Sequence, residues 1–212
     1  MESISAFPVT IGIVIVTVLI SIQGFNNPEV VYKLRHWPTA EKNQKEYYRF
    51  LSSGFVHGSW IHLIINMFVL YQFGGLIEVY FSRLFGSIPG PILFLVVYIL
   101  IIILADIPSY AKHKDNPSFA SIGASGAVSG IIMMYVVFHP WDKIYLYGIL
   151  GIYSILAAVL YIGYSTWADN QQKGRIDHSA HLYGAILGLI FIFALKPSLI
   201  SLFIEQLLQG PL

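Results

Sequence analysis

Cysteine is absent from the sequence, and charged residues are scarce. The 212 residues include 12 Lys and Arg against 11 Asp and Glu, which leaves 11% charged residues and a formal net charge of +1. The absence of cysteine excludes disulfide scaffolds, thiolate metal sites and cysteine nucleophiles. The balanced charge argues against a nucleic-acid-binding protein, because such a protein needs a concentrated basic surface to neutralise phosphates.

Hydrophobic residues make up 56% of the chain. A soluble globular domain carries about 25% charged residues. A water-soluble protein of this size could not cover its surface with the few charges present, so the composition predicts an integral membrane protein.

The charged residues divide the chain into apolar segments. Each segment is long enough, or nearly so, for the about 20 residues that a helix needs to cross a bilayer. Their continuous apolarity favours helices over β-barrel strands, which alternate polar and apolar residues. The first segment lacks the basic flank and the cleavage site of a signal peptide. We therefore predict an all-α polytopic membrane protein, a single domain over residues 1–212 with six transmembrane helices at 7–25, 58–81, 91–107, 122–138, 144–164 and 179–195.

The first loop, residues 26–57, is long, mixed in charge and rich in Trp and Tyr. Aromatic and basic side chains together are typical of the boundary between membrane and water. We expect this loop to lie at the membrane interface.

Polar residues inside membrane helices are costly, so each is a functional candidate. His62, Ser125 and His181 each lie about one turn, ~6 Å, inside the start of the second, fourth or sixth predicted helix. Alternate helices enter the membrane from the same side. These three side chains are therefore expected at one depth, near one membrane face.

These residue types support nucleophilic hydrolysis. A serine hydroxyl is a poor nucleophile until a neighbouring base, usually histidine, takes its proton. Ser125 opens a predicted helix, whose free N–H groups can stabilise an oxyanion, and Gly123 and Gly126 leave room for a substrate backbone. The G-x-S-G pattern alone is equally typical of close packing between membrane helices.

Two further patterns surround these residues. His62 and Asn66 lie one turn apart on one helical face, either as oxyanion-hole donors or as interhelical hydrogen-bonding side chains. Gly184 and Gly188 form a small-residue stripe that predicts close contact with the segment 123–130 and would bring the sixth helix to the fourth.

The histidines allow other roles. Asp177 could orient His181 as in a catalytic triad, but its place in an aqueous loop argues against this, and His178 is expected to be solvated. A metalloprotease would use His57, His62, His178 and His181. No H-E-x-x-H motif is present, and no carboxylate stands beside these histidines inside a helix.

Three motifs together resemble the rhomboid family of intramembrane serine proteases, of the bacterial type with six transmembrane helices. The segment His57–Asn66 resembles the family's H-x4-H-x3-N pattern, Gly123–Gly126 its G-x-S-G, and Ala180–Gly188 its A-H-x2-G-x3-G. Each pattern is common alone, but the three in this order are specific.

The resemblance implies Ser125 as nucleophile and His181 as general base, in a dyad without an aspartate. It implies an oxyanion hole made by His62, Asn66 and the backbone N–H of Ser125. It further implies a serine endopeptidase that cleaves peptide bonds in or near the transmembrane segments of membrane-protein substrates, with no cofactor and no metal.

Other positions support or depart from the family pattern. Arg49 follows Tyr48, where relatives often have Trp, in what would be the membrane-embedded lateral loop, and Glu78 belongs to a structural stretch. Ser129 stands where many relatives place an aromatic that stacks on the catalytic histidine. We expect the Ser129 hydroxyl or Tyr183 to help position that histidine instead.

The distribution of Lys and Arg predicts the opposite membrane orientation to the one that the resemblance implies. The positive-inside rule would put the candidate site in the cytoplasm, whereas the resemblance implies the cell (inner) membrane with the site on the extracytoplasmic side, which we adopt. Nine basic residues lie on the side of the candidate site, against three on the other (Arg83, Lys143 and Lys196): Lys33, Arg35, Lys42, Lys45, Arg49, Lys112, Lys114, Lys173 and Arg175.

Two functions without catalysis remain as alternatives. A catalytically silent rhomboid-like protein would bind membrane clients, but it would be expected to have lost Ser125 or His181. A small transporter would show inverted repeats or charges lining a path, and only Glu78 and Asp106 lie near helix ends.

Overall fold

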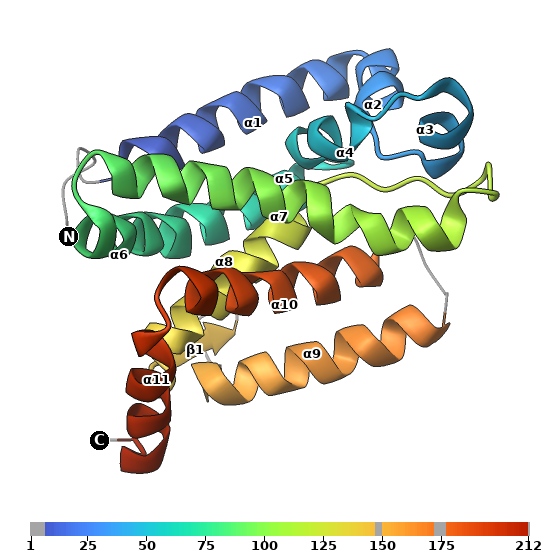
Figure 1. The fold of residues 1–212 in the computed structure, drawn as a ribbon. Coiled ribbons are helices and arrows are strands. Elements are labelled where there is room, and N and C mark those ends of the chain that lie inside the picture. Colours follow the sequence, from blue (N-terminus) through green and yellow to red (C-terminus); the bar gives the residue numbers. More distant parts are fainter. Residues whose placement is uncertain (1–6, 147–149, 172–176, 212) are drawn as a thin grey trace.

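The computed structural model describes residues 7–146, 150–171 and 177–211, which form an almost entirely helical structure (Figure 1). The elements in chain order are α1 (Pro8–Asn26), α2 (Pro28–Leu34), α3 (Pro38–Gln44), α4 (Arg49–Ser52), η2 (Ser53–Phe55), α5 (Trp60–Val69), the π-helical turn η3 (Leu70–Gly74), α6 (Gly75–Phe85), α7 (Pro89–His113), α8 (Ser125–Phe138), β1 (Lys143–Leu146), β2 (Leu150–Tyr153), α9 (Ser154–Gln171), α10 (His178–Leu195) and α11 (Ser198–Gln209).

Four helices of the described chain are long and apolar enough to cross a membrane: α1, the continuous helix formed by α5, η3 and α6, α7, and α10. The apolar helix α8 is shorter, at 14 residues. Large apolar side chains point outward from the bundle, and Ile61 and Phe68 on α5 are 72% and 63% exposed. Large exposed apolar surfaces mark contact with a membrane or a partner, so these faces suit lipid.

Two capping residues fix the starts of helices that carry candidate site residues. The Ser59 hydroxyl accepts a hydrogen bond from the backbone N–H of His62 at 3.2 Å, at the start of α5. The Asp177 carboxylate accepts one from the N–H of Ala180 at 2.9 Å, at the start of α10. Such caps satisfy donors that have no partner inside the helix.

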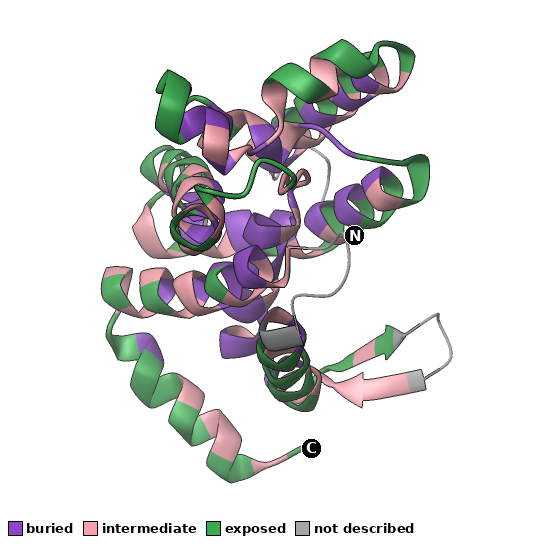
Figure 2. Ribbon diagram, turned by 90° about the vertical axis from the view of Figure 1, so that its right-hand side faces the viewer, coloured by how far each residue is buried: buried purple, intermediate pink, exposed green. Residues whose placement is uncertain are grey.

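The helix α8 lies in the middle of the bundle. Most of its residues are buried, and it packs against α7 and α10. Figure 2 shows the buried residues concentrated in the interior and the exposed ones on the outer helix faces. An apolar helix that is buried on nearly all sides forms the core against which the others pack.

Glycines set the distance between α8 and α10. A Cβ added to Gly184 would lie 2.1 Å from the carbonyl oxygen of Gly126, and one added to Gly188 would lie 2.2 Å from that of Gly130. The two backbones therefore touch at both positions. This is the contact that the small-residue spacing predicts, and it sets the first turns of α8 and α10 side by side.

The predicted helix over 144–164 is wrong in its first part. Lys143–Leu146 and Leu150–Tyr153 pair instead as antiparallel strands, and α9 begins only after them. A short apolar run does not distinguish a helix from a strand, and this one is rich in the β-branched and aromatic residues that favour a strand. Tyr145 pairs with Gly151, and a Cβ there would lie 3.1 Å from the Tyr145 ring.

Two regions contain helices that the apolar segments do not predict. The first loop is folded into the short helices α2, α3 and α4. Beyond the last predicted helix, α11 turns away from α10 and projects from the bundle (Figure 1). Leu199 is its one buried residue.

Candidate active site

Ser125 and His181 meet where the first turns of α8 and α10 lie side by side. Ser125 is the first residue of α8, and His181 lies in the first turn of α10. The Nε2 atom of His181 is 2.6 Å from Oγ of Ser125, which is hydrogen-bonding distance. With Nε2 unprotonated, the hydroxyl donates to the imidazole, which is the arrangement that activates a serine as a nucleophile.

A cavity of about 850 Å³ opens onto this pair. Its walls come from α5, α7, α8, α10, the segment that leads into α8, and residues of the chain before α5 such as Arg35 and Ser53. The residues predicted to form the catalytic site that line it are His62, Asn66, Gly123, Ser125, Gly126 and His181, and the carboxylates Asp106 and Asp177 line it as well. Gly184 and Gly188 are not among the lining residues and lie in the helix contact described above.

The His62 ring lies over Gly123. Gly123 has φ of +120°, and a Cβ there would lie 2.7 Å from Cε1 and 2.8 Å from Nε2 of His62. Both the backbone conformation and the space therefore require glycine. One turn further along α5, Asn66 donates a hydrogen bond from Nδ2 to the His62 carbonyl at 2.9 Å. This bond uses one of the two amide hydrogens of Asn66 and leaves the other to donate elsewhere.

The first loop holds the segment that leads into Ser125. His36 and Ser121 exchange two backbone hydrogen bonds of 3.0 Å. The N–H of Gly123 donates to the carbonyl of Ser53 at 2.9 Å. The position of the first residue of α8 thus depends on chain some 70 to 85 residues earlier, with Ser121 and Gly123 as the points of attachment.

His57 serves the same attachment. The Ser21 hydroxyl donates to the carbonyl of Phe55 at 3.1 Å, so it accepts from Nδ1 of His57, 3.0 Å away. Nε2 is then free to accept from the N–H of Ala124 at 3.4 Å. Burial, with the neighbouring His62 adding to it, lowers the pKa of His57 to about 3. His57 is a neutral linker between α1 and the start of α8.

Asp177 does not complete a triad. Its Oδ1 accepts hydrogen bonds from Oγ of Ser109 at 2.6 Å and from the N–H of Ala180 at 2.9 Å. Its Oδ2 has no hydrogen-bond partner among the residues that the structure describes, so neither oxygen bonds to the His181 ring. Asp177 instead caps α10 and joins it to α7.

The described residues bring one possible metal-ligand group together, and it is not the set of histidines that a metalloprotease would need. The ligand atoms of His36, Asp106 and Asp177 lie within 4.8 Å of one another. Hydrogen bonds within the protein already engage them, such as His36 to Glu41 at 2.7 Å and Ser53 to Asp106 at 3.1 Å. Burial alone would lower the pKa of His36, but Asp106 and Glu41 outweigh it and the pKa is raised.

Arg49 and Glu78 lie outside the cavity and hold helices in place. Arg49 is buried, pairs with Glu46 at 2.6 Å, and donates from Nη1 to the carbonyl of Tyr32 at 2.9 Å. Glu78 on α6 is fully buried and accepts from the N–H groups of Val9 and Thr10 at 2.9 and 2.7 Å. The first residue anchors the first loop, and the second anchors the start of α1.

Tyr161 lies near the site, and the sequence patterns do not predict it. Its ring lies nearly parallel to that of His181, at 22° and 6.4 Å between centroids. The expected substitute, Tyr183, is 41% exposed, and no ring contact with His181 is found for it among the described residues. Ser129 contributes as its hydroxyl bonds both Tyr161 and the Ser125 carbonyl. A hydroxyl inside the apolar span of α9 does not single out Tyr161, because Tyr164, Ser165 and Thr166 of the same helix carry one too.

Comparisons with known proteins agree on the family. A family model of the Rhomboid domain matches residues 44–198, well over half of the chain. Rhomboid protease GlpG of Haemophilus influenzae is 28% identical over 172 residues, which cover 80% of each chain. Rhomboid-like protein 11, chloroplastic, of Arabidopsis thaliana is 29% identical over 176 residues. That alignment covers 73% of this chain. The chain spans about half, 54%, of the plant relative's length.

A more distant similarity extends the set. Rhomboid-like protease 5 of Toxoplasma gondii is 27% identical over 183 residues, which cover 79% of this chain and 18% of the relative. The matched residues 44–198 include every residue that lines the cavity described above except Arg35. With its apolar helices and this domain match, the chain belongs to the rhomboid family and is an integral membrane protein.

Proposed function

We propose that the chain is an intramembrane serine endopeptidase that hydrolyses peptide bonds in or near the transmembrane segments of membrane-protein substrates. The observation that carries the proposal is the 2.6 Å contact between His181 Nε2 and Ser125 Oγ in the wall of a cavity. A catalytically silent member of the family would have no need of this contact.

In the first half of the reaction, Ser125 Oγ attacks the carbonyl carbon of the substrate while its proton passes to His181 Nε2. The C–N bond then breaks, and His181 returns the proton to the leaving amine. In the second half, a water molecule gives a proton to His181 and attacks the acyl carbon. The bond between that carbon and Oγ breaks, and Oγ recovers the proton.

The negative charge on the carbonyl oxygen needs donors during both attacks. The N–H of Ser125 begins α8 and has no partner inside that helix, and the N-terminal end of a helix favours negative charge. The His62 ring and the Asn66 amide line the same cavity. We assign these three groups to the oxyanion hole, where removing one donor typically costs about a hundred- to a thousandfold in rate.

The lipid bilayer is the proposed route to the substrates, because the outer faces of the helices are apolar. A peptide bond inside a regular helix is shielded by the surrounding backbone, and it must leave the helix before Oγ can reach its carbonyl carbon. Substrates with small, helix-destabilising residues near the scissile bond should therefore be cleaved faster. Neither a cofactor nor a metal has a part in this mechanism.

The whole chain, 1–212, is proposed as one rhomboid-like domain in the cell (inner) membrane, with the candidate site on the extracytoplasmic side. The buried bonds from Glu78 to the start of α1 support one domain, because they join a helix outside the matched segment to one inside it. The folded first loop supports the orientation, since its basic residues do not belong to a simple tether.

Reconstitution tests the activity. Purified protein in liposomes is mixed with a model transmembrane substrate, and cleavage is followed for wild type, Ser125→Ala and His181→Ala. We expect each substitution to reduce cleavage at least about a thousandfold. The matched control is Ser198→Ala, which removes a serine at the start of α11 and should leave the rate unchanged. Retained cleavage in either dyad variant would overturn the assignment, and a silent wild type would favour the client-binding alternative.

A further inference from the structure

The contact between Tyr161 and His181 joins the candidate site to α9, a helix of which no described residue lines the cavity. Tyr161 belongs to α9, whereas Ser125 and His181 belong to α8 and α10. The two rings are inclined by 22°, with centroids 6.4 Å apart. This falls within the range of offset-stacked pairs. Tyr161 therefore faces one side of the imidazole that accepts the Ser125 proton.

The hydroxyl of Tyr161 is linked to Ser125, the other residue of the proposed dyad, through Ser129. The Ser129 hydroxyl has one hydrogen, which it donates to the backbone carbonyl of Ser125 at 2.7 Å. Ser129 must therefore accept from Tyr161 in the hydrogen bond between their hydroxyls. A single side chain thus contacts His181 through its ring and Ser125 through one intervening hydroxyl.

Two other interactions of the His181 ring are seen among the described residues. Its Nε2 is engaged by Ser125. The His178 ring meets it at 83°, edge to face, with centroids 6.0 Å apart. One hydrogen bond and one edge contact allow an imidazole to swing about its χ angles. A ring stacked against its face restricts that motion.

The position of Tyr161 depends on how α9 packs. Ala158 on α9 and Ala185 on α10 are both buried in one small apolar cluster, which Tyr161 joins from the same face of α9. The opposite face is exposed, with Val159 at 61% and Trp167 at 60%. Figure 1 shows α9 alongside α10 at the edge of the bundle. Among its described residues, the buried ones, such as Ala158 and Ala168, lie on the side of α9 that faces the bundle.

We propose that Tyr161 is a positioning residue for the dyad, holding the His181 imidazole with its ring and the Ser125 backbone with its hydroxyl, so that alignment of the dyad depends on the docking of α9. This inference rests on the proposed protease activity. Many relatives are expected to carry the stacking aromatic one turn after the nucleophile, where α8 has the small residue Ser129. In this chain the stacking ring would come from α9 instead.

Three variants separate the two contacts. Tyr161→Leu removes ring and hydroxyl, Tyr161→Phe keeps the ring, and Ser129→Ala removes the hydroxyl between Tyr161 and Ser125. The matched control is Tyr164→Leu, because Tyr164 is the same residue type on the same helix and contacts His178 rather than His181. Each variant is reconstituted, and kcat and KM are measured with the model substrate.

Tyr161→Leu should lower kcat about thirty- to a hundredfold and change KM less than about threefold, because misplacement of a reacting group by about 1 Å can cost a hundredfold in rate. Tyr161→Phe should restore most of that loss. Since Tyr161→Phe and Ser129→Ala break the same hydrogen bond, the double variant should lose no more than the worse single one. A structural role alone would instead lower the amount of folded protein and leave kcat per folded molecule unchanged.

Three results would overturn the inference: Tyr161→Leu behaving as Tyr164→Leu does, a loss confined to KM, or multiplicative losses in the double variant. If wild type cleaves nothing, the proposed activity fails first. The contact is then tested by the ¹⁵N NMR signals of His181, labelled in wild type and in both Tyr161 variants. Unchanged signals in Tyr161→Leu would contradict the stacking, and a shift restored in Tyr161→Phe would retain it.

Discussion

His57 and His62 belong to one motif, yet their surroundings give them different tasks. His57 is enclosed between Ser21 and Ala124 and has both ring nitrogens engaged. The His62 ring lies at the cavity, over Gly123. The spacing of the two histidines in the sequence identifies the motif but does not show which of them lies at the cavity. The partners of His57 come from segments far from it along the chain.

The neutral state of His57 predicts how stability depends on pH. Its pKa is lowered to about 3 by burial and by the facing His62 ring, whereas an unfolded histidine has a pKa of about 6.5. Between these values the unfolded chain binds a proton that the folded chain does not. The stabilisation is thus fully present above about pH 6.5 and is lost progressively as the pH falls toward about 3.

We expect His57→Gln to flatten the decline of the free energy of unfolding between pH 6.5 and 4, as followed by denaturation in mixed detergent micelles. At pH 8 both proteins are neutral at position 57, so the difference there measures only the lost hydrogen bonds. If the two curves remained parallel from pH 8 to pH 4, His57 would not be a neutral buried group.

At the scale of the elements, the contact between α8 and α10 is what assembles the candidate site. Gly126, next to Ser125, and Gly184, about one turn after His181, allow the two backbones to touch. Small residues at a spacing of four are visible in the sequence, so this contact could be predicted. The strands β1 and β2 could not, since a continuous apolar run fits a helix equally well.

Gly184→Ala tests the helix contact. The added Cβ would lie 2.1 Å from the Gly126 carbonyl oxygen, and the helices must separate to admit it. We expect destabilisation of about 1–3 kcal/mol, as for overpacked cores, and a fall in kcat of about a hundredfold as His181 moves from Ser125. Unfolding in mixed micelles and initial cleavage rates measure the two effects.

Gly163→Ala on α9 is the control for this substitution, because a Cβ there meets nothing within 4 Å. Alanine in an exposed helix is favoured over glycine by up to about 1 kcal/mol, so this variant should be as stable as wild type or more so, with unchanged cleavage. Wild-type activity in Gly184→Ala would mean that the helix contact does not set the dyad geometry.

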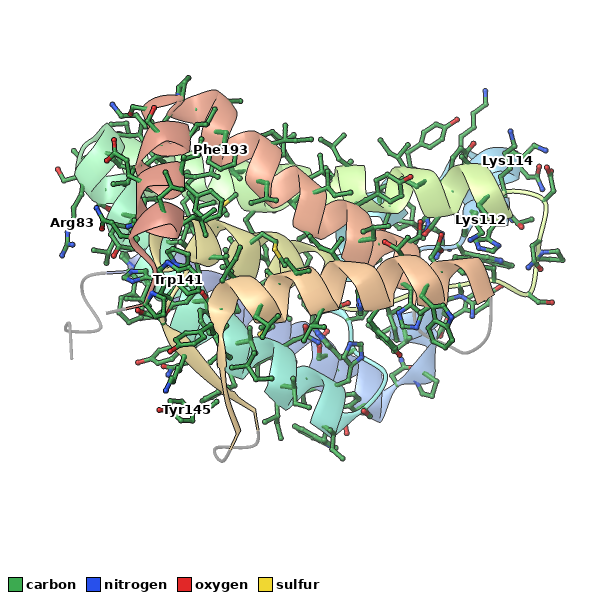
Figure 3. All side chains as sticks on the ribbon, turned by 90° about the horizontal axis from the view of Figure 1, so that it is seen from below. Arg83, Lys112, Lys114, Trp141, Tyr145 and Phe193 are labelled. Atoms are coloured by element: carbon green, nitrogen blue, oxygen red, sulfur yellow. The ribbon has the colours of Figure 1, made fainter. Side chains whose placement is uncertain are left out.

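At the scale of the whole molecule, the two ends differ in charge. Figure 3 shows Lys112 and Lys114 at one end of the molecule and Arg83 with Trp141 at the opposite end. The end with Lys112 and Lys114 carries the larger share of basic residues, which by the positive-inside rule would face the cytoplasm. The family's orientation places it outside.

The absence of cysteine makes this orientation directly measurable. Ser118→Cys lies on the side of the candidate site and Ser87→Cys between α6 and α7, and both positions are exposed. In intact spheroplasts, a membrane-impermeant maleimide should label Ser118→Cys and spare Ser87→Cys until the membrane is opened. The reverse pattern would show that the basic residues, and not the family, predict the topology.

More of the candidate site than of the chain around it could be predicted from the sequence. The residues Ser125, His181, His62 and Asn66 could be found because each is a polar exception within an apolar span. Tyr161 could not, because its relation to His181 depends on how α9 packs and on no local pattern. The same holds for Asp177, whose part as a helix cap depends on where α10 begins and on Ser109 of α7.

The most direct test of the central claim is covalent labelling. A fluorophosphonate reacts with a serine only where a base and oxyanion donors activate it. We predict that the purified wild type forms one adduct, that mass spectrometry finds it on Ser125, and that His181→Ala reduces its formation at least about a hundredfold although Ser125 is retained. An unlabelled wild type, an adduct elsewhere, or undiminished labelling in His181→Ala would contradict the dyad.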